Sequence, residues 1–123
     1  MTVLVADDEP DLCEITRRIL TRAGITVVPA AGYREAIRVA EDYSDEIHLL
    51  LTDLRMPGGS GPELVERLRQ RRPDVRVLYM SGLPGHHPSV LELGPKAAVL
   101  EKPFTAQELL DAVTAALPAV AGR

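Results

Sequence analysis

The sequence has one cysteine and no apolar stretch of membrane-spanning length. Cys13 is the single cysteine among the 123 residues, which excludes a disulfide within the chain and is compatible with a reducing compartment. No apolar run approaches the roughly 18–20 residues that a transmembrane helix needs. The first residues also lack the pattern of a signal peptide. We therefore expect a soluble, cytoplasmic protein with no direct membrane contact.

The chain also lacks a surplus of positive charge. It has 14 Lys and Arg against 18 Asp and Glu, a formal net charge of −4. Nucleic-acid-binding proteins normally carry a basic surface, so we expect no direct nucleic-acid partner.

The length suits one domain, and there are no internal repeats. We expect one folded domain over residues 1–118, a short tail or linker over 119–123, and no separate output module.

Five short apolar runs, rich in β-branched residues and bounded by Gly, Pro or Asp, are typical of buried strands. They are Val3–Ala6, Ile25–Val28, Ile47–Thr52, Val75–Met80 and Ala97–Leu100. The first, third and fourth runs are almost entirely apolar and do not alternate with polar residues. This pattern favours parallel strands that are covered on both faces.

The segments between the runs have apolar residues at helical spacing. These positions are Leu12, Ile15 and Ile19; Tyr33, Ile37 and Ala40; Leu64, Val65 and Leu68; and Leu109, Val113, Ala116 and Leu117. Pro10 suits a first helical position, and residues 60–63 and 105–108 have the pattern of capping boxes. Residues 82–94 have room for little more than a short helix. Alternating strands and helices imply an α/β fold with right-handed crossovers.

Polar residues follow four of the five predicted strands, at the edge where ligands bind in such sheets. They are Asp7, Asp8 and Glu9 after the first run, Asp53 after the third, Ser81 and Gly82 after the fourth, and Glu101 and Lys102 after the fifth. A charge at the end of a buried strand is destabilising unless it is paired or bound. We therefore predict that Asp53 forms one wall of a shared pocket.

Converging carboxylates repel one another unless a cation lies among them. Mg²⁺ prefers oxygen ligands, so Asp8, Asp53 and a loop carbonyl are candidate ligands, with Asp7 binding directly or through water. A carboxylate oxygen can also accept a phosphoryl group, whose oxygens Lys102 and the Ser81 hydroxyl would then bind. Simpler alternatives remain open. The acidic residues could stabilise a helix start or a turn, Ser81 could be an ordinary hydroxyl at a strand end, and Lys102 could be a solvated lysine.

These residues together closely resemble the receiver domain of two-component response regulators, over essentially the whole chain. The motifs are Asp7-Asp8, Asp53, Ser81 and Lys102-Pro103-Phe104. The stretches LTDLRMPGGSGPEL, MSGL and LEKPFT look most like receivers of hybrid histidine kinases. The resemblance implies a CheY-like, flavodoxin-like fold: a doubly wound, five-stranded parallel sheet with strand order 2-1-3-4-5 and helices on both faces.

The resemblance also implies a function in phosphorelay signal transduction. A histidine kinase or a phosphotransfer protein would phosphorylate the domain in the presence of Mg²⁺, and a downstream protein would bind the switched surface. The implied residues are the phosphoacceptor Asp53; the metal ligands Asp7, Asp8, Asp53 and the backbone carbonyl of Arg55; the phosphoryl-binding and switch residues Ser81 and Lys102; and Pro103 after a cis peptide bond.

One position departs from the family pattern. Receivers often carry Tyr or Phe three residues before the lysine, where this chain has Val99. The switch is therefore expected to rely on the Ser81 loop and the short fourth helix, or on Tyr79. A receiver-like interaction module that works without phosphorylation is one alternative function. An aspartate-nucleophile phosphatase is another, but it would want a second Asp at position 55, which is Arg; we expect no turnover of an outside substrate.

Other polar residues are interpreted as structural. His86 and His87 lie in a Gly/Pro-rich loop and are expected to face solvent. Cys13 is expected to pack on the first helix. A group of arginines makes a basic helix end, which is interpreted as a solvated face or a partner contact; it comprises Arg67, Arg69, Arg71 and Arg72.

Overall fold

The structure is a computed structural model that describes residues 1–118. The predicted tail, residues 119–123, lies outside the described residues. The strands are β1 (Thr2–Ala6), β2 (Thr26–Ala30), β3 (Leu49–Asp53), β4 (Arg55–Met56), β5 (Gly59–Ser60), β6 (Arg76–Ser81) and β7 (Val99–Glu101). The helices are α1 (Pro10–Arg22), α2 (Tyr33–Asp42), α3 (Gly61–Arg69), α4 (Pro88–Leu91) and α5 (Ala106–Ala116). None of these helices combines the length and the hydropathy that crossing a bilayer requires.

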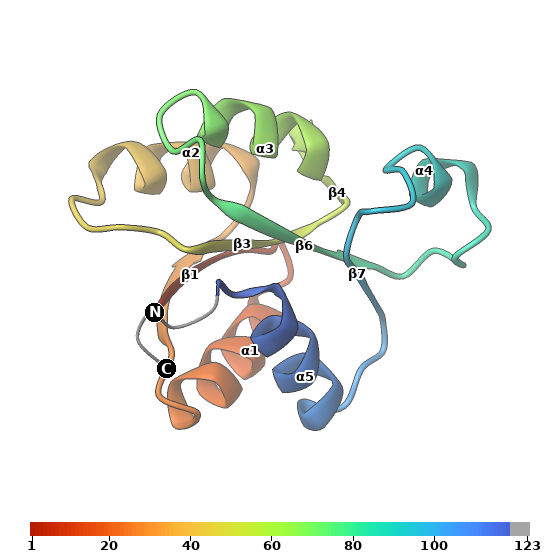
Figure 1. Cartoon of the computed structure of the whole chain (residues 1–123), viewed down its shortest axis with the longest axis horizontal. Coiled ribbons are helices and arrows are strands. Elements are labelled where there is room, and N and C mark those ends of the chain that lie inside the picture. Colours follow the sequence, from red (N-terminus) through yellow and green to blue (C-terminus); the bar gives the residue numbers. More distant parts are fainter. Residues whose placement is uncertain (119–123) are drawn as a thin grey trace.

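Five strands form one parallel sheet in the order β2-β1-β3-β6-β7. Counted along the five predicted strands, this is the order 2-1-3-4-5, so the predicted topology is confirmed. Figure 1 shows α2 and α3 on one face of the sheet and α1 and α5 on the other. The short antiparallel pair of β4 and β5 was not predicted, because two residues per strand give no periodic pattern.

The sheet separates two hydrophobic cores, and β1 supplies both of them. Leu4 and Ala6 belong to the core on the α2 and α3 side, whereas Val3 and Val5 belong to the core on the α1 and α5 side. Successive side chains of a strand point to opposite faces, so a strand covered on both faces buries all of them. This explains why the central strands appear in the sequence as continuous apolar runs.

The predicted helix starts are present. α1 begins at Pro10, and α3 and α5 are each preceded by a capping box. At α3, the Ser60 hydroxyl accepts from the Glu63 backbone N–H at 3.2 Å, and the Glu63 carboxylate accepts from the Ser60 N–H at 3.1 Å. Such caps contribute about 1 kcal/mol each. They fix where two helices begin at the edge of the sheet that carries the polar residues.

The buried face predicted for α1 is partly wrong. Ile15, expected on that face, is 52% exposed, and the buried residues are Cys13, Thr16 and Leu20. The buried face of α1 contains the fully buried Thr16, and the spacing of apolar residues alone does not indicate a face that includes a threonine. Cys13 packs in the core on the α1 and α5 side, as expected.

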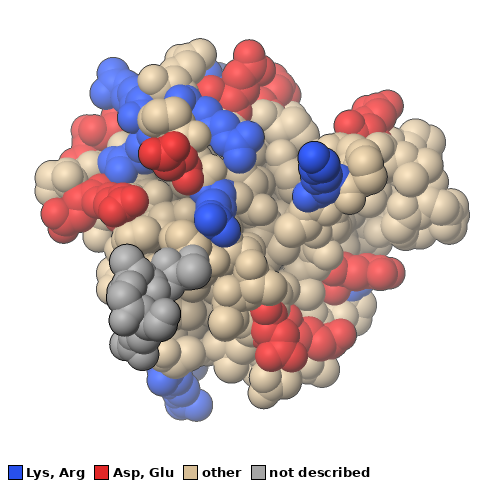
Figure 2. All heavy atoms as spheres, in the orientation of Figure 1, with Lys and Arg blue, Asp and Glu red and all other residues tan. Residues whose placement is uncertain are grey.

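Three of the arginines predicted to form a solvated helix end have structural partners, one of them in the Arg71–Glu41 ion pair at 3.6 Å. The Arg72 guanidinium donates to the carbonyls of Ala40, Tyr43 and Asp45 at 3.0, 2.6 and 2.9 Å. Arg69 donates to a backbone carbonyl just before β6. Because the last carbonyls of a helix have no partner inside the helix, Arg72 satisfies the end of α2. On the face shown in Figure 2, basic and acidic side chains are mixed over α2 and α3.

The chain between β6 and β7 projects from the body of the domain (Figures 1 and 2). We call residues 82–98 the α4 segment. It contains α4, a helix of 4 residues, and no residue of the segment is buried. The prediction of a short helix in this connection is confirmed.

Candidate functional site

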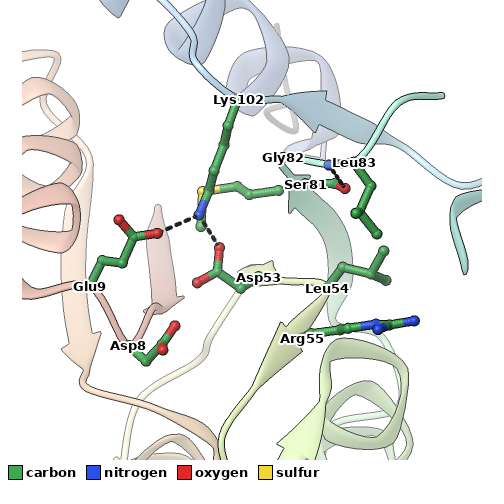
Figure 3. Close-up of a pocket in the computed structure, with 10 residues that line it drawn as sticks. Asp8, Glu9, Asp53, Leu54, Arg55, Ser81, Gly82, Leu83 and Lys102 are labelled. Atoms are coloured by element: carbon green, nitrogen blue, oxygen red, sulfur yellow. Dashed lines mark hydrogen bonds and ion pairs between the residues drawn. The ribbon is translucent and has the colours of Figure 1, made fainter. Parts of the chain in front are cut away.

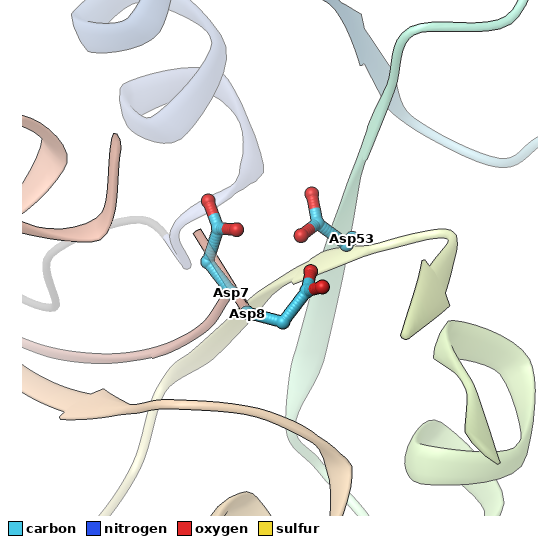
Figure 4. Close-up of side chains that lie close together, drawn as sticks. All are labelled: Asp7, Asp8 and Asp53. Atoms are coloured by element: carbon cyan, nitrogen blue, oxygen red, sulfur yellow. The ribbon is translucent and has the colours of Figure 1, made fainter. Parts of the chain in front are cut away.

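The three predicted aspartates converge at one end of the sheet (Figure 4). Asp7 and Asp8 follow β1, and Asp53 is the last residue of the neighbouring strand β3. One carboxylate oxygen of each residue lies within 4.8 Å of those of the other two. Asp7 and Asp53 are buried, with 1% and 4% exposure, while Asp8 is exposed. The separation of the three carboxylates is compatible with a shared cation.

Lys102 enters the same site from the loop after β7 (Figure 3). Its Nζ lies 2.6 Å from Asp53 Oδ1 and 3.4 Å from Glu9 Oε1, and its side chain is 19% exposed. The Lys102 backbone N–H donates to the Ser81 carbonyl at 2.8 Å. The Lys102–Pro103 peptide bond is cis. The ammonium group therefore points into the site and not toward bulk water.

The electrostatics of the site raise the pKa of Asp53 when no cation is bound. Burial and the neighbouring Asp7 raise the pKa of Asp53 to about 8, although Lys102 acts in the opposite direction. For Lys102, burial lowers the pKa, but the ion pair with Asp53 and the charge of Asp7 outweigh burial and raise it. The raised pKa makes the Asp53 carboxylate easier to protonate than a free one while no cation lies beside it. Further positive charge beside Asp53 would lower that pKa.

Two buried carboxylate oxygens of the site have no hydrogen-bond partner among residues 1–118: Asp7 Oδ2 and Asp53 Oδ1. The other oxygen of Asp7, Oδ1, accepts from the Glu9 N–H at 2.9 Å. Lys102 contacts Asp53 Oδ1 as an ion pair, but the angles are not those of a hydrogen bond. Buried polar atoms are normally satisfied, and a hard divalent cation with oxygen ligands would satisfy both. The donor set therefore fits Mg²⁺.

A cavity of about 340 Å³ is lined by Asp8, Glu9, Asp53 and Lys102, with Ser81, Gly82 and Leu83 also on its wall. Ser81, the last residue of β6, is 4% exposed. Its Oγ accepts from the Leu83 N–H at 3.0 Å, so the hydroxyl hydrogen remains free to turn into the cavity. A small anionic group bound to Asp53 would find donors on both sides.

Arg55 and Gly61 border the site from the segment that follows β3. Arg55, in β4, is exposed and lines the cavity; its guanidinium donates to the hydroxyl of Ser89 in α4. At Gly61, the first residue of α3, an added β-carbon would lie 2.6 Å from the Asp53 carbonyl oxygen and 3.1 Å from the Tyr79 ring. The start of α3 therefore packs directly against the end of β3.

Val99 and Tyr79 lie opposite each other at the pairing of β6 with β7. Val99 is 36% exposed, while Tyr79 is 9% exposed and belongs to the core on the α2 and α3 side. Rotation of Tyr79 out of this core would leave a void. The burial of Tyr79 thus makes a large movement of its side chain costly.

Two contacts of the site have no counterpart in the sequence pattern. Glu9 was noted beside the acidic pair, but its contact with Lys102, 93 residues away, has no signal in the pattern. For Arg55, only the backbone carbonyl was considered, although its side chain reaches Ser89, 34 residues away. Both depend on how loops meet after the strands have paired.

Comparison with known sequences identifies the family. Residues 3–114 match the response regulator receiver domain family. The chain is 32% identical over 113 residues to the sensor kinase CckA of Brucella abortus, covering 91% of this chain and 12% of that protein. It is 34% identical over 117 residues to the C4-dicarboxylate transport transcriptional regulatory protein DctD of Pseudomonas aeruginosa, covering 94% of this chain and 25% of that protein. The chain thus spans only a small part of these relatives.

Solved structures give the same result. The receiver domain of the hybrid histidine kinase CckA has a TM-score of 0.80 at 28% identity, covering 96% of this chain and 100% of that one. A response regulator receiver domain protein from Clostridium thermocellum has a TM-score of 0.80 at 28% identity, covering 94% and 92%. The chain belongs to the response regulator receiver domain family of two-component signalling. The predicted CheY-like fold and the likeness to receivers of hybrid kinases are confirmed.

Proposed function

We propose that the domain accepts a phosphoryl group on Asp53, in a Mg²⁺-dependent reaction, from a histidine kinase or a phosphotransfer protein. One observation carries the proposal. Lys102 Nζ lies 2.6 Å from Asp53 Oδ1, beside a cavity that Asp8 and Asp53 line. A carboxylate oxygen of Asp7 lies within 4.8 Å of those of Asp8 and Asp53. A nucleophilic oxygen, a fixed cation and a set of oxygen ligands are the parts that phosphoryl transfer needs.

The proposed Mg²⁺ ligands are Asp7, Asp8, Asp53 and the backbone carbonyl of Arg55. When bound there, the ion would neutralise the converging carboxylates and the charge of the incoming group. This role agrees with the buried Asp7 Oδ2, which has no hydrogen-bond partner among residues 1–118. It also agrees with the pKa of about 8 for Asp53 in the cation-free site, since added positive charge would lower that pKa and free the nucleophile.

In the proposed step, an Asp53 carboxylate oxygen forms a bond to phosphorus while the P–N bond of a phosphohistidine donor breaks. The electron pair of that bond stays on the donor nitrogen. Lys102 and the hydroxyl of Ser81 bind the transferred oxygens as negative charge spreads over them. The product, an aspartyl phosphate, places roughly 1.5–2 negative charges in the cavity, which would draw Ser81 and Lys102 inward.

The proposed output is binding of a downstream protein to a surface that the phosphoryl group switches. The exposed α4 segment, which continues from Ser81, is the part of the domain best placed to change. We propose a cytoplasmic location, no direct contact with nucleic acid or membrane, and no turnover of an outside substrate. The domain would assist only its own phosphorylation and dephosphorylation.

Incubation with acetyl phosphate or phosphoramidate tests the proposal. In the presence of Mg²⁺, intact-mass measurement should show a gain of one phosphoryl group. The gain should be absent in Asp53→Asn and after chelation of the cation. The matched control is Asp42→Asn, which removes an exposed carboxylate of α2 and should label like the wild type.

Two other outcomes would favour the alternative functions. Steady turnover of a generic phosphate ester would point to an aspartate-nucleophile phosphatase, against which Arg55 already argues. Absence of labelling under every condition would point to an interaction module that works without phosphorylation, for which Val99 is the relevant departure.

A further inference from the structure

The α4 segment is weakly attached to the rest of the domain. None of its residues is buried, and its apolar contact with the core consists of the partly buried Leu83, Val90, Leu93 and Ala97. Segments with few buried apolar contacts open at a small cost in free energy. One additional tie to the body of the domain can therefore change how often the segment opens.

Such a tie connects the segment to the loop that follows the proposed phosphoacceptor. Arg55, two residues after Asp53, donates from Nη2 to the Oγ of Ser89 in α4. Within residues 1–118, the other side-chain hydrogen bond between the α4 segment and its surroundings joins Leu83 to the nearby Ser81. Figure 3 shows the Arg55 side chain pointing away from Asp53.

The Arg55 guanidinium would have a stronger partner in a phosphorylated site. Over the described part of the chain, no carboxylate lies within salt-bridge distance of Arg55, and its side-chain hydrogen-bond partner is a neutral hydroxyl. The bond to Ser89 joins a charged donor to a neutral acceptor, whereas a phosphoryl group would add attraction between opposite charges. The planar guanidinium also matches phosphate oxygens in a two-point contact. Arg55 lines the cavity into which Asp53 would present its phosphoryl group.

We propose that Arg55 is a latch: it holds the α4 segment through Ser89 while Asp53 is unmodified, and it turns to the phosphoryl group once Asp53 carries one. The inference rests on the proposed phosphorylation of Asp53. The exchange of partners releases Ser89 and shifts the α4 segment toward its open positions. Arg55 would thus act on the output surface with its side chain, in addition to the role proposed for its backbone carbonyl.

Hydrogen exchange measured by mass spectrometry on the full chain tests the latch. In the unmodified protein, Ser89→Ala should raise exchange in peptides from residues 82–98 several-fold. Arg55→Gln should raise it by the same factor, and the double variant should add nothing, because all three remove the same bond. Acetyl phosphate with Mg²⁺ should raise exchange of the wild type by a similar factor and should change Ser89→Ala little.

Matched variants separate this tie from a general loosening of the domain. Ser44→Ala and Arg67→Gln alter exposed residues outside the α4 segment and the cavity, and they should leave exchange of residues 82–98 unchanged. Ser89→Thr keeps the hydroxyl and should keep the wild-type exchange. A Ser89→Thr variant that exchanges like Ser89→Ala would overturn the latch.

The same samples distinguish failure of the latch from failure of the proposed function. Ser89 is outside the proposed phosphoryl site, so Ser89→Ala should gain one phosphoryl group like the wild type. If the wild type is labelled but its α4 segment exchanges as before, or if the two single variants have additive effects, the latch is wrong and the proposed function stands. If neither protein is labelled, the proposed function fails and the latch loses its trigger.

Discussion

The end of β3 and the α4 segment lie at the same edge of the sheet but are built in opposite ways. At the end of β3, Asp53 is 4% exposed and follows fully buried apolar residues. In the α4 segment no residue is buried, and Leu91 is 64% exposed. Tight packing fixes the positions of the charged groups, while sparse packing leaves the neighbouring segment free to shift. The domain thus combines a tightly packed charged site with a loosely packed neighbouring segment.

The largest expected effect is on the free energy of unfolding. It appears when the same substitution, Leu to Ala, is made in β3 and in the α4 segment. Leu50→Ala removes a fully buried side chain from β3 and should lower the free energy of unfolding by about 2–5 kcal/mol. Leu91→Ala in α4 should change it by less than about 0.5 kcal/mol. Urea unfolding of both variants measures the difference. Similar losses would mean that the α4 segment contributes to the core as much as β3 does.

A second prediction concerns the buried charge itself. The pKa of Asp53 is about 8 in the folded protein and about 3.9 in an unfolded chain. Between these values the folded state binds more protons, so stability without a divalent cation should fall as pH rises from about 4 to about 8. Asp53→Asn cannot ionise and should be more stable than the wild type at pH 8 by about 1–3 kcal/mol.

Urea unfolding at several pH values in the presence of a chelator checks this prediction. Asp42→Asn, on the exposed face of α2, should follow the pH dependence of the wild type. An Asp53→Asn variant with the wild-type pH dependence would show that another group dominates the electrostatics of the site.

The smallest expected effect is the response to Mg²⁺. At a concentration of ten times its Kd, the ion should stabilise the folded wild type by about 1.4 kcal/mol. The increment should shrink at acidic pH, because protons compete for the carboxylates. Leu91→Ala should keep the increment, since the α4 segment supplies none of the proposed ligands, whereas Asp53→Asn should lose most of it. Thermal unfolding across a Mg²⁺ titration measures all three, and an unchanged increment in Asp53→Asn would place the ion elsewhere.

The sequence was sufficient to predict the sheet and to bring the site residues to one edge of it. Doubly covered strands leave continuous apolar runs, and in a parallel sheet the residues after adjacent strands must lie together. Asp7, Asp53 and Lys102 could therefore be grouped before any coordinates were known. The capping boxes before α3 and α5 were predictable for a similar reason, because both partners lie within four residues of each other.

Features that depend on tertiary contacts were not predictable. Thr16 is buried in α1 where Ile15 was expected, because the neighbouring elements and not hydropathy set the face of that helix. Arg72 lies in the loop after α3, yet its side chain donates to backbone carbonyls at the end of α2. The bond between Arg55 and Ser89 likewise joins residues 34 positions apart, and no local pattern indicates it.

The close approach at Gly61 has a consequence for protein engineering. Any side chain at this position would push against the backbone carbonyl of Asp53, so a mutation outside the acidic cluster could still misplace the nucleophile. Libraries intended to give this domain new binding partners should therefore keep position 61 fixed and diversify exposed positions of the α4 segment, such as His86 and Leu91.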